Sequence, residues 1–309
     1  MGHGSERSIS AVLIAGPTAS GKSAVALELA EALGGRVVNA DSMQVYRDLR
    51  VLTARPPADE EARAPHFLYG HVDGSEHYSV GRWQGDVRRV LEETDGSLPI
   101  IIGGTGLYFS ALTEGLAEVL PIPAEVREHW RRRGRTEPVQ ALHEELARRD
   151  PVMAARLRPT DPQRVVRALE VIDGLGRSLA SFQQETGGLL EPQRALRLVL
   201  DVEPEVLRQR INARFDAMVS AGAMEEVRCL VERRLDPTLP IMKAHGMPWL
   251  AAHIDGTMAL DDAIDRAKGD TRRYAKRQRT WFRHRMADWH WVRPDEAVGF
   301  ALQAIKAAQ

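Results

Sequence analysis

The 309-residue chain is long enough for one large or two modest domains with an ample core. Its formal net charge is -1, so a nucleic-acid surface would have to come from local clustering of basic residues. The single cysteine, Cys229, excludes a disulfide framework and a Cys-based zinc finger, and no apolar run approaches the roughly 18 residues of a membrane span. Since the first residues are also too polar for a signal peptide, we expect a soluble cytoplasmic protein without membrane contact, acting as a monomer.

The first predicted elements are a strand, a glycine loop and a helix. The apolar run at residues 12–15 predicts a buried strand, and Val25, Leu29 and Leu33 recur at helical spacing. Backbone amides and the helix N-terminus of such a loop surround a phosphate, while its lysine contacts the outer phosphate and its serine hydroxyl binds Mg²⁺. We therefore predict a di- or triphosphate site, with Mg²⁺ at Ser23. The residues that match G-x-x-x-x-G-K-[ST] are Gly16, Pro17, Thr18, Ala19, Ser20, Gly21, Lys22 and Ser23.

Strands and helices then alternate along the chain. Gly34-Gly35 ends the first helix, and strands are predicted at residues 36–40, 98–102 and 196–202. Residues 78–91 and 203–219 predict helices, Gly222 breaks the second of these, and the rest of the chain is expected to be mostly helical. The stretch 47–75, with three prolines, is expected to be an irregular loop. This alternation predicts an α/β fold with a parallel sheet flanked by helices.

Composition changes near Pro121. Residues 121–192 contain no convincing strand and are rich in Arg, Glu and Ala. Helices are predicted there at residues 124–133, 138–149 and 162–174. We therefore predict a P-loop α/β core from residues 1–120 and 193–309, the latter including a basic helical C-terminal region, and a helical insertion domain from residues 121–192.

Three predicted strand ends carry polar groups: the phosphate loop, Asp41-Ser42 and Thr105. Ligands bind outside the carboxyl ends of parallel strands, so these groups should converge on one crevice. Asp41 is the only carboxylate among them and is the candidate base or metal holder. An aspartate there also caps turns and a threonine also caps helices, but their joint position beside the phosphate loop favours function.

A basic stretch lies near the C-terminus. Residues 266–285 contain nine Arg or Lys against the single Asp270, with Tyr274, Trp281 and Phe282 interleaved. A solvated helix face is the usual explanation of such a run. Basic residues mixed with stacking aromatics also suit single-stranded nucleic acid, and this density favours RNA or DNA binding.

Five segments together resemble the bacterial tRNA dimethylallyltransferases (tRNA isopentenyltransferases). They are GPTASGKS, NADSMQVYR (39–47), GGTGLY (103–108), DPQRVVRALEV (161–171) and TRRYAKRQRTWFR (271–283), in the family's order and approximate spacing. The phosphate loop alone is shared with many kinases, whereas the second, third and fifth segments together are highly specific. One departure concerns the aromatic of a Gly-Tyr pair that follows a basic residue in many members. Here the sequence keeps Lys243 but continues Ala244-His245-Gly246-Met247-Pro248.

The resemblance implies that a dimethylallyl group moves from dimethylallyl diphosphate to N6 of the adenosine just 3′ of the anticodon, position 37 of tRNA. It implies Asp41 as general base, Thr105 as a hydrogen-bond partner of the leaving pyrophosphate, and Lys243 as the cation that neutralises the pyrophosphate, with Mg²⁺ as cofactor. Residues 41–44 would hold the adenine, extruded from the anticodon stem-loop. The tRNA-contacting residues implied are Asp41, Ser42, Met43, Gln44, Thr105, Arg127, Gln163, Arg164, Val165, Val166, Arg167, Arg272, Arg273 and Arg277.

Several alternatives stay open on the residues alone. Arg127, Arg164 and Arg167 can be solvent-facing residues of the inserted helices. Arg210 and Arg214 resemble the lid arginines of small-molecule kinases, but an exposed helix face explains them, so we leave them outside the site. The competing functions are a P-loop kinase of a small metabolite, an adenylate prenyltransferase with AMP as acceptor, and a non-catalytic RNA-binding protein switched by a nucleotide. The helical insertion and the basic C-terminal stretch favour a large RNA acceptor.

Overall fold

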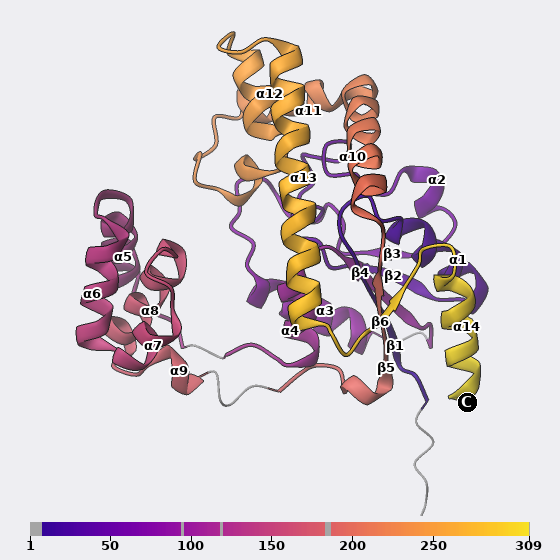
Figure 1. Ribbon diagram of the computed structural model, residues 1–309, viewed down its shortest axis with the longest axis horizontal. Coiled ribbons are helices and arrows are strands. Elements are labelled where there is room, and N and C mark those ends of the chain that lie inside the picture. The colour runs from indigo at the N-terminus through magenta and orange to yellow at the C-terminus, as the bar shows by residue number, and fades with distance from the viewer. Residues whose placement is uncertain (1–7, 94–95, 118–119, 183–186, 309) are drawn as a thin grey trace, which may run out of the picture. The chain divides into compact units, whose positions relative to one another are not determined.

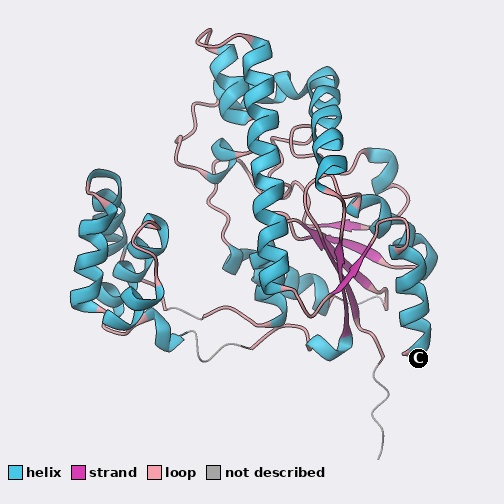
Figure 2. Ribbon diagram, in the orientation of Figure 1, coloured by secondary structure: helices cyan, strands magenta, loops and turns pink. Residues whose placement is uncertain are grey.

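Within the part of the chain that the structure describes, six parallel strands form one sheet in the order β3-β2-β4-β1-β5-β6 (Figure 1). The computed structural model describes residues 8–93, 96–117, 120–182 and 187–308. The predicted α/β class, with a parallel sheet and flanking helices, is confirmed (Figure 2). The strands are β1 (Ala11–Ala15), β2 (Arg36–Asn39), β3 (His66–Phe67), β4 (Pro99–Gly103), β5 (Ala195–Leu200) and β6 (His290–Val292).

The central strands are buried along their whole length, which explains their continuous apolar sequences. In β1 and β4 every residue is buried, and Val12 pairs with Ile100 while Ile14 pairs with Ile102. These four side chains belong to one apolar cluster with α1 (Lys22–Leu33) and α14 (Ala297–Ala307), which cover this face of the sheet. A strand that is covered on both faces cannot alternate apolar and polar residues.

One expectation about the strands is wrong: residues 47–75 are not entirely irregular, because β3 lies within them and pairs with β2. The region after β5 is mostly helical, as expected, but it also contains β6, which the sequence did not indicate and which pairs with β5 at the opposite edge of the sheet. Both are edge strands of two or three residues, too short to show a periodic pattern. The remaining helices around the sheet are α2 (Ala58–Glu61), α3 (Val80–Glu92), α4 (Gly106–Thr113), α10 (Pro204–Met218), α11 (Met224–Glu232), α12 (Met247–Ile254) and α13 (Leu260–Arg285).

Glycines end two helices as predicted. Gly34 caps α1 with φ 59°, and Gly222, with φ 107°, lies in the five-residue π-helix Val219–Ala223 that separates α10 from α11. Both values lie in the left-handed region, where a residue without Cβ is favoured.

The chain divides into two compact units, residues 1–113 with 189–309 (the α/β unit) and residues 114–188 (the helical unit). The helical unit has its own core, which contains Trp130, Leu142, Leu146 and Leu169. The three predicted helices are present, together with two short ones that the periodicity did not indicate. The helices are α5 (Ala124–Thr136), α6 (Val139–Arg149), α7 (Pro151–Arg156), α8 (Pro162–Leu175) and α9 (Leu179–Phe182).

Within the described residues, no helix is both long and apolar enough to cross a membrane.

Candidate active site

The phosphate loop joins β1 to α1 in a conformation that its small residues permit. Ala19 and Gly21 have φ values of 64° and 93°. A Cβ on Gly16 would lie 2.8 Å from the Oγ of Ser20, which is fully buried inside the turn. The loop therefore folds tightly on itself at the N-terminus of α1, where helix dipole and free amides favour an anion.

Lys22 is a cation whose charge is poorly solvated. Its Nζ donates a hydrogen bond to the carbonyl of Pro17 at 2.9 Å. Burial lowers the pKa of Lys22 to about 8, although the nearby carboxylate of Asp41 opposes that shift. The guanidinium of Arg214 lowers the pKa of Lys22 further. An anion bound between these two cations would offset their repulsion.

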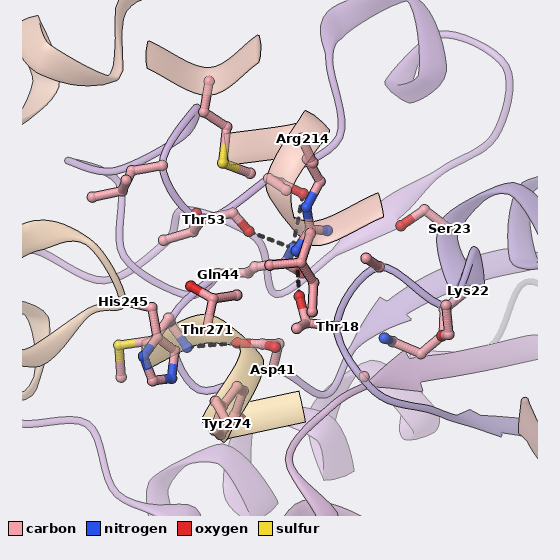
Figure 3. A pocket seen from close by; sticks show the side chains of 18 of the residues that line it. Thr18, Lys22, Ser23, Asp41, Gln44, Thr53, Arg214, His245, Thr271 and Tyr274 are labelled. Atoms are coloured by element: carbon pink, nitrogen blue, oxygen red, sulfur yellow. Dashed lines mark hydrogen bonds between the residues drawn. The ribbon is translucent and has the colours of Figure 1, made fainter. Parts of the chain in front are cut away.

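Asp41 lies at the carboxyl end of β2 and shapes the turn that follows it. The side chain of Asn39 accepts a hydrogen bond from the amide of Asp41, and Asp41 Oδ1 accepts one from the amide of Met43, both at 2.9 Å. Asp41 is thus a turn cap, and it also lines the cavity beside the phosphate loop (Figure 3). Capping engages one carboxylate oxygen, so a role for the other is compatible with it.

Thr105 supports this turn from the adjacent strand end. Its Oγ1 accepts a hydrogen bond from the amide of Ser42 at 3.1 Å. Residues 41–44 line the cavity, whereas Thr105 is not part of the lining. The side chain of Thr105 is hydrogen-bonded to the hydroxyl of Tyr274. The phosphate loop and Asp41-Ser42 converge on one cavity as predicted, whereas Thr105 contacts Ser42 from outside the cavity lining.

The cavity has a volume of about 750 Å³ and lies within the α/β unit. Its lining is both polar and apolar: the phosphate loop contributes polar groups, and α10 contributes apolar side chains. Lys243, at the end of the 3₁₀ turn Pro240–Lys243, is exposed and belongs to the lining. The apolar side chains in the lining include Met43, Leu52, Ile211, Phe215 and Met218.

Leaving Arg210 and Arg214 outside the site was wrong, because both line this cavity. Arg214 is hydrogen-bonded through Nη2 to Thr18 Oγ1 of the phosphate loop, and burial lowers its pKa. Arg210 is exposed and lies one turn earlier on α10. Their spacing of four residues was the available signal, but the contact spans 196 positions.

Gln278 of α13 is a second site residue that the sequence reasoning missed. Its Oε1 accepts a hydrogen bond from the amide of Thr18 at 2.9 Å, and its Nε2 donates one to the carbonyl of Gly104 at 2.8 Å. The side chain is buried, and a Cβ on Gly104 would lie 2.2 Å from Nε2. One neutral amide inside a basic stretch was the signal. It joins the phosphate loop to the loop after β4.

The basic stretch has two faces on α13. On the inner face Arg272 donates to Asn212 Oδ1 of α10 at 2.7 Å, and Tyr274 lines the cavity. On the outer face Arg273 and Arg277 are exposed. Of the three interleaved aromatics, Phe282 is buried in the core and therefore cannot stack on a base. A separate shallow cavity on the outer face is lined by Arg273, Lys276, Arg277, Thr280, Trp281, His284 and Arg285.

Of the residues at the departure from the family pattern, 243–248, some are buried in the core and others line the cavity. Met247, at the position of the missing aromatic, is buried and begins α12. His245 lines the cavity, with its ring centroid 4.3 Å from that of Tyr274. Burial and the neighbouring Arg277 lower the pKa of His245.

In the helical unit, most residues predicted to contact RNA lie at the surface. Arg127, Gln163, Arg164 and Arg167 are exposed. The prediction for Val165 is wrong for its side chain, which is 0% exposed inside the core of the unit. Val166 is partly buried and faces α5, with its Cγ2 only 2.7 Å from where a Cβ on Gly134 would be.

Comparison of the chain with known proteins identifies its family. The family model described as IPP transferase matches residues 44–285, more than half of the chain. The chain belongs to the IPP transferase family. The predicted resemblance is thereby confirmed. A second model, isopentenyl transferase, matches residues 9–68, which contain the phosphate loop.

Relatives of this chain match along nearly their whole length. A tRNA dimethylallyltransferase of Methylorubrum extorquens is 55% identical over 300 residues, covering 96% of this chain and 95% of the relative. One from a Bradyrhizobium species is 56% identical over 293 residues, covering 94% and 96%.

Solved structures are also similar. The full-length tRNA isopentenylpyrophosphate transferase of Bacillus halodurans has a TM-score of 0.70 at 33% identity, covering 97% of this chain and 98% of that one. A eukaryotic dimethylallyltransferase acting on tRNA has a TM-score of 0.77 at 30% identity, covering 88% and 69%.

The lowered pKa of Lys22, about 8, predicts a pH dependence of anion binding. A diphosphate beside Nζ favours the charged form and raises that pKa. Affinity should therefore be constant well below pH 8 and weaken by up to about tenfold per pH unit above it. Calorimetry of prenyl diphosphate binding near pH 9, in buffers of different ionisation enthalpy, should detect uptake approaching one proton. Uptake that persists in Lys22→Met would assign the proton to another group.

Replacing Gln278 by Met should weaken binding of the prenyl diphosphate about tenfold or more. The substitution keeps the length of the side chain but leaves the Thr18 amide and the Gly104 carbonyl without this partner, and an unpaired buried group costs roughly 1–3 kcal/mol. Titration calorimetry measures the effect. Lys276→Gln, on the outer face of the same helix, is the matched control and should bind normally. Equal affinity of the two variants would reduce Gln278 to a packing role.

Proposed function

We propose that this enzyme transfers a dimethylallyl group from dimethylallyl diphosphate to N6 of the adenosine just 3′ of the anticodon in tRNA. The observation that carries the proposal is the shared cavity: an anion-binding loop, the carboxylate of Asp41 and an apolar wall line one space of about 750 Å³. A prenyl diphosphate has a matching charged end and apolar end. The names of the relatives, tRNA dimethylallyltransferases, support the same substrate pair.

The donor's diphosphate would bind at the phosphate loop. Loop amides and the N-terminus of α1 donate hydrogen bonds, and the charges of Lys22 and Arg214 offset those of the phosphates. The five-carbon chain would lie against Leu52, Phe215 and Met218, whose burial from water favours an apolar ligand. Lys243 is exposed in the lining and is suited to neutralise the departing pyrophosphate.

Mg²⁺ fits the donor set at this loop. Ser23 offers an exposed hydroxyl in the first turn of α1 and lines the cavity. No group of three or more His, Cys, Asp or Glu side chains able to hold a metal occurs among the described residues. That suits Mg²⁺, which is commonly held by few protein oxygens together with substrate phosphates and water. When bound, the ion would supply further positive charge to the leaving group.

The transfer exchanges one bond for another. N6 attacks the terminal allylic carbon of the donor, the C–O bond to the diphosphate breaks, and its electron pair leaves with pyrophosphate. The N6 proton becomes acidic as the new C–N bond forms, and Asp41 accepts it as general base. Asp41 Oδ1 is held by the amide of Met43, so the carboxylate is fixed before the substrate arrives. Thr105 lies outside the cavity lining, so it would act by supporting the turn that carries Asp41 and not by a direct hydrogen bond to the pyrophosphate.

The acceptor would contact both units of the chain. Residues 41–44 line the cavity and would hold the extruded adenine, since a base must leave its stack to be modified. The exposed Arg273 and Arg277 of α13, and the exposed arginines of the helical unit, would contact the phosphate backbone. Arg272 already has Asn212 as a partner and contributes less. We also propose that the enzyme works as a cytoplasmic monomer.

An anticodon stem-loop incubated with dimethylallyl diphosphate and Mg²⁺ should gain the mass of one dimethylallyl group, on the adenosine 3′ of the anticodon. Mass spectrometry of the intact RNA and of its digest measures this. AMP and a stem-loop with guanosine at that position are the controls and should stay unmodified. Equal prenylation of AMP would favour the adenylate prenyltransferase, and phosphoryl transfer from ATP without prenylation would favour a kinase. A protein that binds RNA and nucleotide without either product would be a switch.

Asp41→Asn should lower the single-turnover rate by roughly 10²–10⁴-fold. The amide oxygen can still accept from the amide of Met43, so the turn is kept, but the side chain no longer accepts the N6 proton. Rapid-quench kinetics measures the rate, and affinities for donor and stem-loop should stay near those of the unmodified enzyme. A near-normal rate would leave Asp41 as a turn cap alone.

A further inference from the structure

Glu170 is a buried carboxylate at the boundary between α5 and α8 of the helical unit. Its side chain is only 4% exposed. Its Oε1 accepts from Arg131 Nε at 3.2 Å and its Oε2 accepts from Arg167 Nη1 at 3.0 Å. One carboxylate therefore holds two guanidiniums, one from each helix.

The two arginines are only partly used by this contact. Their side chains are 51% and 43% exposed, and each guanidinium has five N–H donors. An isolated arginine on a helix surface samples many rotamers and loses that freedom on binding. Holding Arg131 and Arg167 through a buried anion limits those rotamers before any ligand arrives, so less freedom is lost on binding.

Further arginines extend the same surface. Arg127 lies one turn before Arg131 on α5, and Arg164 lies one turn before Arg167 on α8. The two helices pack closely, as the approach of Val166 to Gly134 requires. The four guanidiniums thus lie on exposed positions of two adjacent helices, with one buried carboxylate beneath two of them.

We propose that Arg131 and Arg167, held by Glu170, form a binding site for one phosphodiester of the RNA backbone, with Glu170 as the positioning residue. This inference rests on the proposed function, which supplies the RNA. Planar guanidiniums match a phosphate with paired N–H donors, and two of them fixed side by side present donors to both free oxygens.

The sign of the effect separates positioning from simple charge. Glu170 is an anion close to a polyanion, so removing its charge without further consequence should tighten RNA binding. If Glu170 positions the arginines, removing its charge should weaken RNA binding despite the better charge balance.

The test compares Glu170→Gln with Glu145→Gln in the full-length enzyme. Glu145 of α6 also accepts from two arginines, Arg148 and Arg149, but its side chain is more exposed, at 18%. For Glu170→Gln we expect the KM for the stem-loop to rise about fivefold or more, with kcat at saturating RNA and the KM for dimethylallyl diphosphate unchanged. The slope of log K against log[salt] should become shallower by about 0.7–0.9, as for one lost phosphate contact. Glu145→Gln should change none of these.

Two further variants keep the proposal testable if Glu170→Gln does not fold, as judged by circular dichroism. Arg131→Gln and Arg167→Gln each change an exposed residue and leave Glu170 one partner, and each should flatten the salt dependence in the same way. Unchanged or tighter RNA binding in Glu170→Gln, or an unchanged salt slope in both arginine variants, would overturn the inference. If the unmodified enzyme neither binds nor prenylates the stem-loop, the proposed function fails instead.

Discussion

The side-chain amide of Gln278 joins two loops that the parallel sheet brings to one edge. It accepts from the phosphate loop at Thr18 and donates to the loop after β4 at Gly104, so α13 is fixed against both. Glycines occupy the second loop because other groups approach its backbone closely, with Gln278 doing so at Gly104. A Cβ on Gly103 would lie 2.0 Å from the carbonyl oxygen of Ala40, and one on Gly106 would lie 2.2 Å from the ring of Trp281. The Gly-Gly-Thr-Gly sequence therefore places residues without a side chain where a Cβ would collide with a neighbouring group.

The charges of the cavity are arranged before any ligand is present. The positive charge of Arg214 repels that of Lys22 in a space largely shielded from water, and burial lowers the pKa of both side chains. The two positive charges repel each other until an anion binds between them. Because both groups are already in place and already shielded from water, binding the anion costs little reorganisation. Asp41 lies close enough to raise the pKa of Lys22, so the base and the anion site share one electrostatic environment. Transfer from a diphosphate needs both functions within the length of one substrate.

The sequence predicted the features that are local. The phosphate loop, the end of α1 at Gly34, the central strand β4 and the convergence of Asp41 with Thr105 depend on short patterns and on the geometry of a parallel sheet. Gln278 and Arg214 were missed because their contacts join residues 260 and 196 positions apart, and the local signals at these positions do not reveal those distant partners. Val165 was misassigned for the converse reason. A motif shared along α8 does not say which of its side chains the helix turns toward the core.

The departure from the family pattern at residues 245–247 changes side-chain packing and adds no positive charge to the cavity. Met247 fills a buried position at the start of α12, so exchanging an aromatic for methionine there changes packing in the core. Met247 does not line the cavity, whereas the nearby His245 does. His245 forms part of the cavity wall and packs against Tyr274 with the two rings tilted by 40°, and burial and the charge of Arg277 lower the pKa of His245. A neutral imidazole adds an aromatic surface without adding a positive charge. The cations that line the cavity are Lys22, Arg210, Arg214 and Lys243, while His245 gives the wall a flat ring against which a base could stack.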